Sequence, residues 1–170
     1  LKTHDAQAHG PVPRVGRGRL RHRVVVDVDD VVEHAHGGAH GATQLGLIEA
    51  VGADVAITNG GGIRGDKEYP AGTKLTRGDV FAELPFGNKT VKLDVTGQQL
   101  MDALVNGFSQ ADMAAGRFPQ VSGLTVEVDL AKRPSERVLA VTVGGKPLDP
   151  AAHYTLATND FMAGGGDGYV

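Results

Sequence analysis

Two glycine-rich segments carry the side chains best suited to binding a ligand. The first runs from Asn59 to Arg64, with Gly60, Gly61 and Gly62 between its polar ends. Consecutive glycines let a ligand approach the backbone closely and expose its N–H groups. The planar arginine side chain is suited to phosphate. The segment predicts a ligand-binding loop, and the alternative is a flexible turn with a solvated arginine.

The second segment, residues 161–167, places Phe161 before a run of glycines that includes Gly165 and Gly166 and ends at Asp167. Aromatic side chains normally lie inside helices and strands, where they bury apolar area. An aromatic side chain on a loop can instead stack on a nucleobase, which contributes about 1–3 kcal/mol per base. Asp167 could then accept hydrogen bonds from sugar hydroxyls. The alternative is a hydrophobic plug followed by an Asx-type turn.

A third candidate is Phe86, in the segment Pro85-Phe86-Gly87-Asn88 that follows the end of a predicted helix. On its own this residue could anchor the core at the end of that helix. Together, Phe86 and Phe161 would form a slot for a flat ring.

The remaining chemistry-bearing residues give weaker signals. His34, His36 and His40, with Glu33 beside them, have the spacing of metal ligands. No rigid element is predicted around them, so we assign no metal site to the chain. It also has no phosphate-binding P-loop, no serine-nucleophile motif and no cysteine. We assign no catalytic residue, and we expect His153 to be a surface or packed side chain.

Hydrophobic spacing and capping residues predict the elements that position these loops. We expect helices at 43–52, after Thr76 and after Thr96, and strands at 55–58, 90–95, 124–130, 139–143 and 154–158. The helix after Thr76 would have an apolar side formed by Val80, Phe81 and Leu84. Because helices and strands interleave and several strands are joined as hairpins, the predicted class is α+β, with mixed β-sheets and packed helices.

Composition indicates one domain with an atypical beginning. The chain has 170 residues, 41% hydrophobic, and a formal net charge of −3, which does not favour a nucleic-acid or membrane partner. No apolar run has the length of a membrane span, and no signal segment is visible. Residues 1–40 hold six of the seven histidines and no aromatic residue. We expect that segment to be disordered or mis-framed apart from a strand at Val24–Val26, extended by Val31–Val32, and residues 41–170 to form the domain, shortened at its end.

Three motifs in order, Asn59–Arg64, Leu84–Asn88 and Asn159–Tyr169, resemble the C-terminal domain of the 5′-nucleotidases. The resemblance covers about residues 41–170. It implies that Phe86 and Phe161 sandwich the nucleobase and that Asp167 binds the ribose hydroxyls. It also implies that Asn59 and Arg64 reach toward the base or the phosphate. An arginine that the family carries just before this region has no counterpart in residues 20–45.

The resemblance implies a part of a metal-dependent phosphohydrolase that converts nucleoside monophosphates to nucleosides and phosphate. Two divalent metal ions would lie in an N-terminal metallophosphoesterase domain, a partner not contained in this chain, so the chain alone is expected to be inactive. The family implies a periplasmic, cell-surface or secreted location. The alternative is a non-catalytic binding or interaction module that retains the fold.

Overall fold

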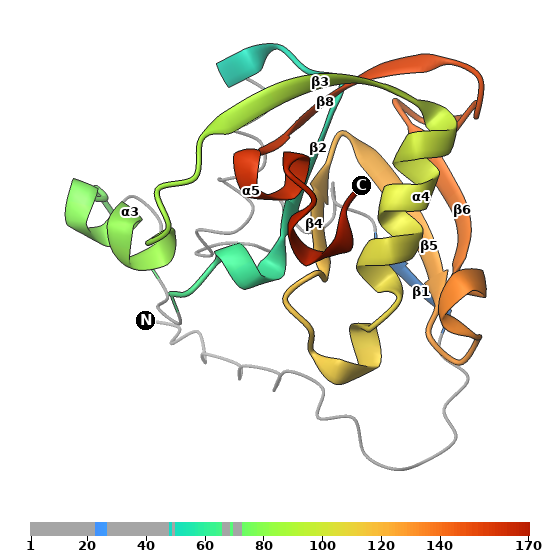
Figure 1. The fold of residues 1–170 in the computed structure, drawn as a ribbon, viewed down its shortest axis with the longest axis horizontal. Helices are drawn as coiled ribbons and strands as arrows, with labels where there is room; N and C mark the ends of the chain where they lie inside the picture. The colour runs from blue at the N-terminus through green and yellow to red at the C-terminus, as the bar shows by residue number, and fades with distance from the viewer. Residues whose placement is uncertain (1–22, 27–47, 49, 66–68, 70–72) are drawn as a thin grey trace, which may run out of the picture.

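The computed structural model describes residues 23–26, 48, 50–65, 69 and 73–170, which form two four-stranded sheets (Figure 1). One sheet has the order β1-β5-β6-β7 and the other β3-β8-β2-β4. The strands are β1 (Arg23–Val26), β2 (Val55–Asn59), β3 (Thr90–Thr96), β4 (Pro119–Ser122), β5 (Leu124–Asp129), β6 (Val138–Val143), β7 (Lys146–Pro147) and β8 (His153–Asn159). The α-helices are α3 (Arg77–Glu83), α4 (Gly97–Phe108) and α5 (Asp160–Ala163), and short 3-10 turns are η1 (Gly60–Gly62), η2 (Ala111–Met113), η3 (Pro134–Glu136) and η4 (Gly166–Gly168).

The sheet that contains β2 is mixed, as predicted. β2 pairs in parallel with β8 and antiparallel with β4, while β3 pairs antiparallel with β8. All five residues of β2 are buried, which fits a central strand covered on both faces. This arrangement confirms the α+β class with mixed sheets.

Helix α4 was predicted from its cap and its spacing, and both are present. The Thr96 hydroxyl accepts from the Gln99 N–H, and the Gln99 side chain accepts from the Thr96 N–H, which completes a capping box. Leu100, Leu104 and Phe108 are buried on one side of the helix. They join the core with residues of both sheets, including Val55 and Ile57 of β2 and Val126 and Val128 of β5. The helix therefore ties the two sheets together.

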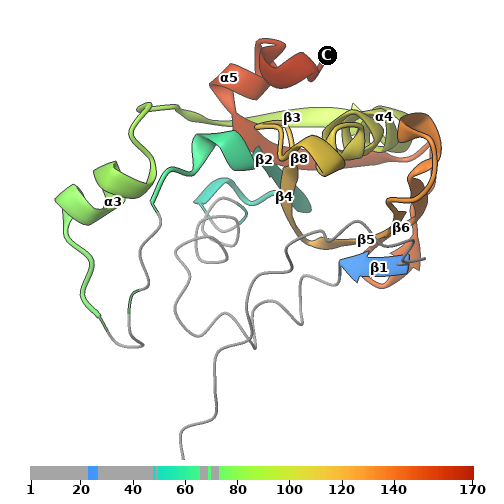
Figure 2. The same ribbon diagram turned by 90° about the horizontal axis from the view of Figure 1, so that it is seen from below.

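Helix α3 has the predicted cap, and its apolar side is largely exposed. Thr76 and Asp79 form its capping box. The side chains of Val80 and Phe81 are 47% and 57% exposed, whereas Glu83 is 5% exposed. In Figure 2 the helix stands beside the sheets and is not laid across either of them. Its apolar side therefore borders a hollow and is not part of the core.

Several local predictions are confirmed and others differ. Strand β1 confirms Val24–Val26, whereas Val31–Val32 and most of the helix predicted at 43–52 lie outside the described residues. Strand β4 was not predicted, because four residues that begin with a proline give little alternation to read. Leu139 is 40% exposed, since it has no partner at a bulge where Glu127 pairs with Ala140 and Val128 with Val138. Among the described residues, no helix has the length and apolar character of a membrane span.

Candidate functional site

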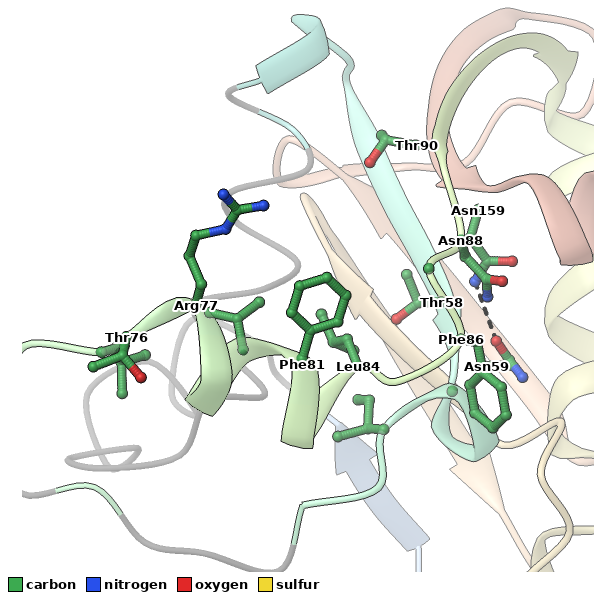
Figure 3. A pocket seen from close by; sticks show the side chains of 15 residues that line it. Thr58, Asn59, Thr76, Arg77, Phe81, Leu84, Phe86, Asn88, Thr90 and Asn159 are labelled. Atoms are coloured by element: carbon green, nitrogen blue, oxygen red, sulfur yellow. Dashed lines mark hydrogen bonds between the residues drawn. The ribbon is translucent and has the colours of Figure 1, made fainter.

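The ends of two parallel strands bring the glycine-rich segments together. Strand β2 ends at Asn59 and its parallel neighbour β8 ends at Asn159, so the segments that follow them start from the same edge of the sheet. Asn159 caps α5 by accepting the Met162 N–H at 2.8 Å. Its Nδ2 donates to Oδ1 of Asn59 at 3.2 Å, as the dashed line in Figure 3 shows. Segments one hundred residues apart are joined at this point.

All five side chains expected to bind a ligand border one hollow of about 240 Å³ at this edge, here called the Asn59 hollow. It is lined by Asn59, Gly61, Gly62, Arg64, Phe86, Asn88, Gly116, Phe161 and Asp167. Sequence motifs had singled out most of these residues, but Gly116 lies in no motif and was missed. Asn88 was quoted only as the end of the Phe86 segment.

The two phenylalanines of the Asn59 hollow are exposed. Phe86 is 57% exposed and Phe161 46%, which does not fit the core-anchor and plug alternatives. Phe161 lies in the short helix α5, where a loop was expected. Among the described residues the ring–ring contact is made elsewhere, between Phe108 and Phe118. Phe86 and Phe161 therefore face the hollow without stacking on another aromatic ring of this part of the chain.

Gly166 supports the Phe161 ring through its lack of a side chain. A Cβ placed on Gly166 would lie 2.5 Å from two ring carbons of Phe161, far inside van der Waals contact. The ring therefore rests directly on the backbone of the 164–168 turn. This contact gives Gly166 a steric role in the site.

Arg64 stacks on Phe86. Its guanidinium carbon lies 5.0 Å from the centroid of the Phe86 ring, within the range of a cation–π interaction. The Arg64 N–H donates to the Glu83 carbonyl at 2.9 Å, which ties this loop to the end of α3. The arginine thus brings a positive charge to the rim of the hollow beside an exposed aromatic ring.

Asp167 has an unusual backbone conformation and a buried partner. Its φ of 55° is left-handed, which is uncommon for a residue other than glycine. Its Oδ2 accepts a hydrogen bond of 2.7 Å from Nδ2 of Asn59. Asn59 is only 4% exposed. Because the Asn59 amide also accepts from Asn159, both of its polar ends are engaged within the protein. The structure therefore gives the Asn59 amide a supporting contact to Asp167, and its expected reach toward the base or the phosphate stays a prediction.

Two glycines of the first segment, Gly60 and Gly61, use their N–H groups within the protein, whereas these groups were expected to face a ligand. The N–H groups of Gly60 and Gly61 donate to the carbonyls of Phe118 and Gly116 at 2.7 and 2.8 Å. A Cβ on Gly61 would lie 2.8 Å from the Gly116 Cα. These glycines therefore allow two backbone segments to pack closely, and their two N–H groups are not directed at a ligand.

A second, larger hollow lies beside α3 and is here called the α3 hollow. It has a volume of about 430 Å³ and shares Asn59, Gly62, Phe86 and Asn88 with the Asn59 hollow. In Figure 3, Phe81 of α3 and Leu84, the residue that follows the helix, lie on the side of Thr58, near the end of β2. Phe86 thus stands at the boundary between the two hollows.

The sequence supplies the observation that identifies the chain. The family model described as "5′-nucleotidase, C-terminal domain" matches residues 28–170. This chain belongs to the 5′-nucleotidase C-terminal domain family. The resemblance expected from the three motifs is confirmed, while the boundary at residue 41 stays a prediction.

Relatives of this 5′-nucleotidase C-terminal domain are much longer proteins. The trifunctional nucleotide phosphoesterase protein YfkN of Bacillus subtilis (strain 168) is 41% identical over 126 residues, which is 71% of this chain and 8% of that protein. Protein UshA of Escherichia coli (strain K12) is 36% identical over 122 residues, 72% of this chain and 20% of that protein. The crystal structure of the 5′-nucleotidase precursor from Thermus thermophilus has a TM-score of 0.67 and 42% identity, and the match covers 75% of this chain and 25% of that one. The domain is therefore one part of larger proteins in this family.

The described part of this 5′-nucleotidase C-terminal domain offers no set of metal ligands. No group of three histidine, aspartate, glutamate or cysteine side chains is placed to hold a metal ion there. His34, His36 and His40, which have the spacing of metal ligands, lie outside the described residues. His153, the first residue of β8, is exposed and contacts Asp94 at 2.5 Å, as expected for a surface histidine.

Proposed function

We propose that this domain binds a nucleoside or nucleoside monophosphate in the Asn59 hollow, as the substrate-recognition part of a 5′-nucleotidase-type phosphohydrolase. The observation that carries the proposal is that Phe86, Phe161, Asp167 and Arg64 border one hollow, although they come from three separate segments of the chain. Exposed aromatic rings beside a carboxylate and a guanidinium match the parts of a nucleotide. Each ligand group would meet a suitable side chain.

The nucleobase would insert between Phe86 and Phe161, where stacking contributes about 1–3 kcal/mol. The ribose hydroxyls would donate to the Asp167 carboxylate, which Asn59 holds from behind. The phosphate would accept hydrogen bonds from the guanidinium of Arg64, whose planar shape allows two parallel bonds to two phosphate oxygens. The Arg64 stack on Phe86 links the phosphate end to the base end.

The hydrolytic step belongs outside the described residues. The family resemblance implies divalent metal ions, and the described residues do not fit as their ligands. The role proposed for this chain is therefore to bind and orient the substrate for a metallophosphoesterase domain of a longer protein. By itself the chain would bind nucleotides without hydrolysing them.

Paired substitutions test the stacking assignment. Phe86→Ala and Phe161→Ala are each expected to weaken adenosine binding by about 5- to 100-fold, the range that one stacking contact supplies. Phe81→Ala is the matched control, because Phe81 is as exposed as Phe86 but lies in the α3 hollow. If adenosine binding survives both substitutions in the Asn59 hollow, the stacking role is wrong and a non-catalytic interaction module becomes the better account.

A further inference from the structure

We infer that Asn106 and Arg117 are positioning residues that fix the direction of the Asp167 carboxylate, and thereby set the preference of the site for ligands with free ribose hydroxyls. The inference rests on the proposed function and extends it to two residues that do not line the Asn59 hollow. Neither residue belongs to the motifs that identify the family.

The argument begins with the backbone of Asp167. A left-handed φ of 55° costs free energy in a residue with a Cβ, so surrounding contacts must hold it. The Asp167 side chain is held on one side by Asn59. The Asp167 carbonyl accepts a hydrogen bond of 3.2 Å from Nδ2 of Asn106, near the end of α4. Asn106 of α4 therefore hydrogen-bonds to the main chain of Asp167, the residue with the left-handed conformation.

Arg117 sets the orientation of the Asn106 amide. Its Nη1 donates to Oδ1 of Asn106 at 3.0 Å. A guanidinium can only donate, so this bond requires the amide oxygen to face Arg117 and the amide nitrogen to face Asp167. The hydrogen bond from Asn106 to the Asp167 carbonyl therefore depends on Arg117 as well.

The next residues close the same arrangement. Tyr169 is 6% exposed, and its hydroxyl donates to the Arg117 carbonyl at 2.7 Å. Burial, and after it the charge of Asp167, raises the pKa of the Tyr169 phenol, which keeps it a donor. A Cβ on Gly168 would lie 3.2 Å from Oδ1 of Asn106. Residues 167–169 are thus clamped between α4 and the segment that contains Arg117.

The binding test compares adenosine with 2′,3′-dideoxyadenosine, which keeps the base and lacks the hydroxyls. The 170-residue chain should prefer adenosine by about 10-fold or more, as for hydrogen bonds to a charged group. Asn106→Asp, which replaces the donor with an acceptor at the same size, should remove most of that preference and leave dideoxyadenosine binding within about twofold. Arg117→Ala should also reduce the preference for adenosine. Arg117→Lys, which retains a donor, should keep part of that preference.

Gln98→Ala is the matched control, because the Gln98 amide makes a hydrogen bond on the exposed side of the same helix, to Asp102 at 2.9 Å. A preference for adenosine that is unchanged in Asn106→Asp would overturn the inference. An equal loss of affinity for adenosine and for dideoxyadenosine would also overturn it, because this would indicate general damage to the fold.

A second measurement needs no ligand and separates this inference from the proposed function. Hydrogen exchange of the free chain should rise in residues 165–170 of Asn106→Asp and stay unchanged in β2 and β8. Unchanged exchange in residues 165–170 would contradict the clamp even if nucleosides bind. Failure of the parent chain to bind adenosine, with faster exchange in the variant, would reject the proposed function and retain the clamp.

Discussion

Nδ2 of Asn59 lies 2.7 Å from Oδ2 of Asp167, although 108 residues separate them in the chain. This contact joins the end of β2 to the turn after α5, and it gives Asn59 and Asp167 different roles in the Asn59 hollow. Asp167 presents its carboxylate to the hollow. Asn59, which is buried, supports that carboxylate from behind.

We predict that Asn59→Asp destabilises the fold in a pH-dependent way. Two carboxyl groups would replace an amide–carboxylate pair, so one of them should have a raised pKa. The loss relative to the parent chain should reach about 1–3 kcal/mol at neutral pH. It should shrink on acidification as that carboxyl takes up a proton, because a raised folded-state pKa favours the fold at low pH.

Urea unfolding between about pH 8 and pH 5 measures the pH dependence, which the linkage between protonation and folding predicts. Asn88→Asp is the control, since Asn88 lines the same hollow but is exposed. A loss of stability that is equal at both pH values would contradict the paired-carboxyl explanation.

Gly166→Ala should impair base binding without unfolding the domain. The new methyl group would meet the Phe161 ring at 2.5 Å, so the ring must move away from its seat. We expect adenosine affinity to fall by about 10-fold, within the range of one stacking contact. Gly164→Ala is the control, because its Cβ would meet its nearest neighbour at 3.3 Å. Equal affinities in the two variants would show that the Phe161 position is unimportant.

Arg64 should distinguish adenosine monophosphate from adenosine. Arg64→Ala should weaken the monophosphate by about 10- to 100-fold, the effect of losing a charged hydrogen-bond donor, and adenosine by much less. Arg64→Lys keeps the charge but loses the planar guanidinium, so its affinity for the monophosphate should lie between those of the parent chain and Arg64→Ala. Calorimetry with both ligands gives the comparison. Equal losses for the two ligands would mean that Arg64 acts through Phe86 alone.

Arg137 should matter for stability and not for binding. It is 5% exposed, and its Nη1 donates to the carbonyls of Phe108 and Ser109, each at 3.0 Å, at the end of α4. Arg137→Met would leave buried acceptors and the helix end without a cation, at a cost of about 2–4 kcal/mol. Arg133→Ala, which removes an exposed ion pair with Glu136, should change the unfolding free energy by less than about 0.5 kcal/mol. Similar urea midpoints for the two variants would contradict this assignment.

Asp54 should contribute to stability only above acidic pH. Its Oδ2 accepts from the Thr155 hydroxyl and N–H at 2.6 and 2.8 Å, and these bonds lower the pKa of Asp54 from its usual 3.8. A lowered pKa stabilises the fold above the usual value and loses the effect as pH falls through the lowered one. Asp54→Asn should therefore cost about 0.5 kcal/mol at neutral pH, because the side chain is exposed. The cost should shrink as pH falls below 3.8 toward the lowered pKa, and a cost that does not change over this fall in pH would refute the prediction.

Local signals in the sequence were sufficient for some elements and insufficient for others. The helix after Thr96 was predictable because its capping box and the spacing of Leu100, Leu104 and Phe108 agree. The shared apolar side of α3 was predictable from spacing, but its exposure to a hollow was not, because spacing does not show whether a neighbour covers a face. The bulge that exposes Leu139 depends on pairing with β5, which alternation alone does not reveal.

The same distinction applies to the site. The motifs located the five side chains expected to bind a ligand, all of which border the Asn59 hollow, since each stands out in its own short segment. Their partners could not be predicted, because the hydrogen bonds from Asn59 to Asp167 and from Asn106 to Asp167 join segments far apart in the sequence. The close packing of Gly61 on Gly116 is likewise a property of the fold. A run of glycines suggests ligand contact and close backbone packing equally well.

The most direct measurement is calorimetric titration of the folded chain with adenosine, and with ribose 5-phosphate as a ligand that lacks the base. The account predicts saturable binding of adenosine and much weaker binding of ribose 5-phosphate, because stacking on Phe86 and Phe161 supplies the larger share of the affinity. Ribose 5-phosphate binding as well as adenosine, or no binding of adenosine at all, would contradict the central claim that the Asn59 hollow recognises a nucleobase.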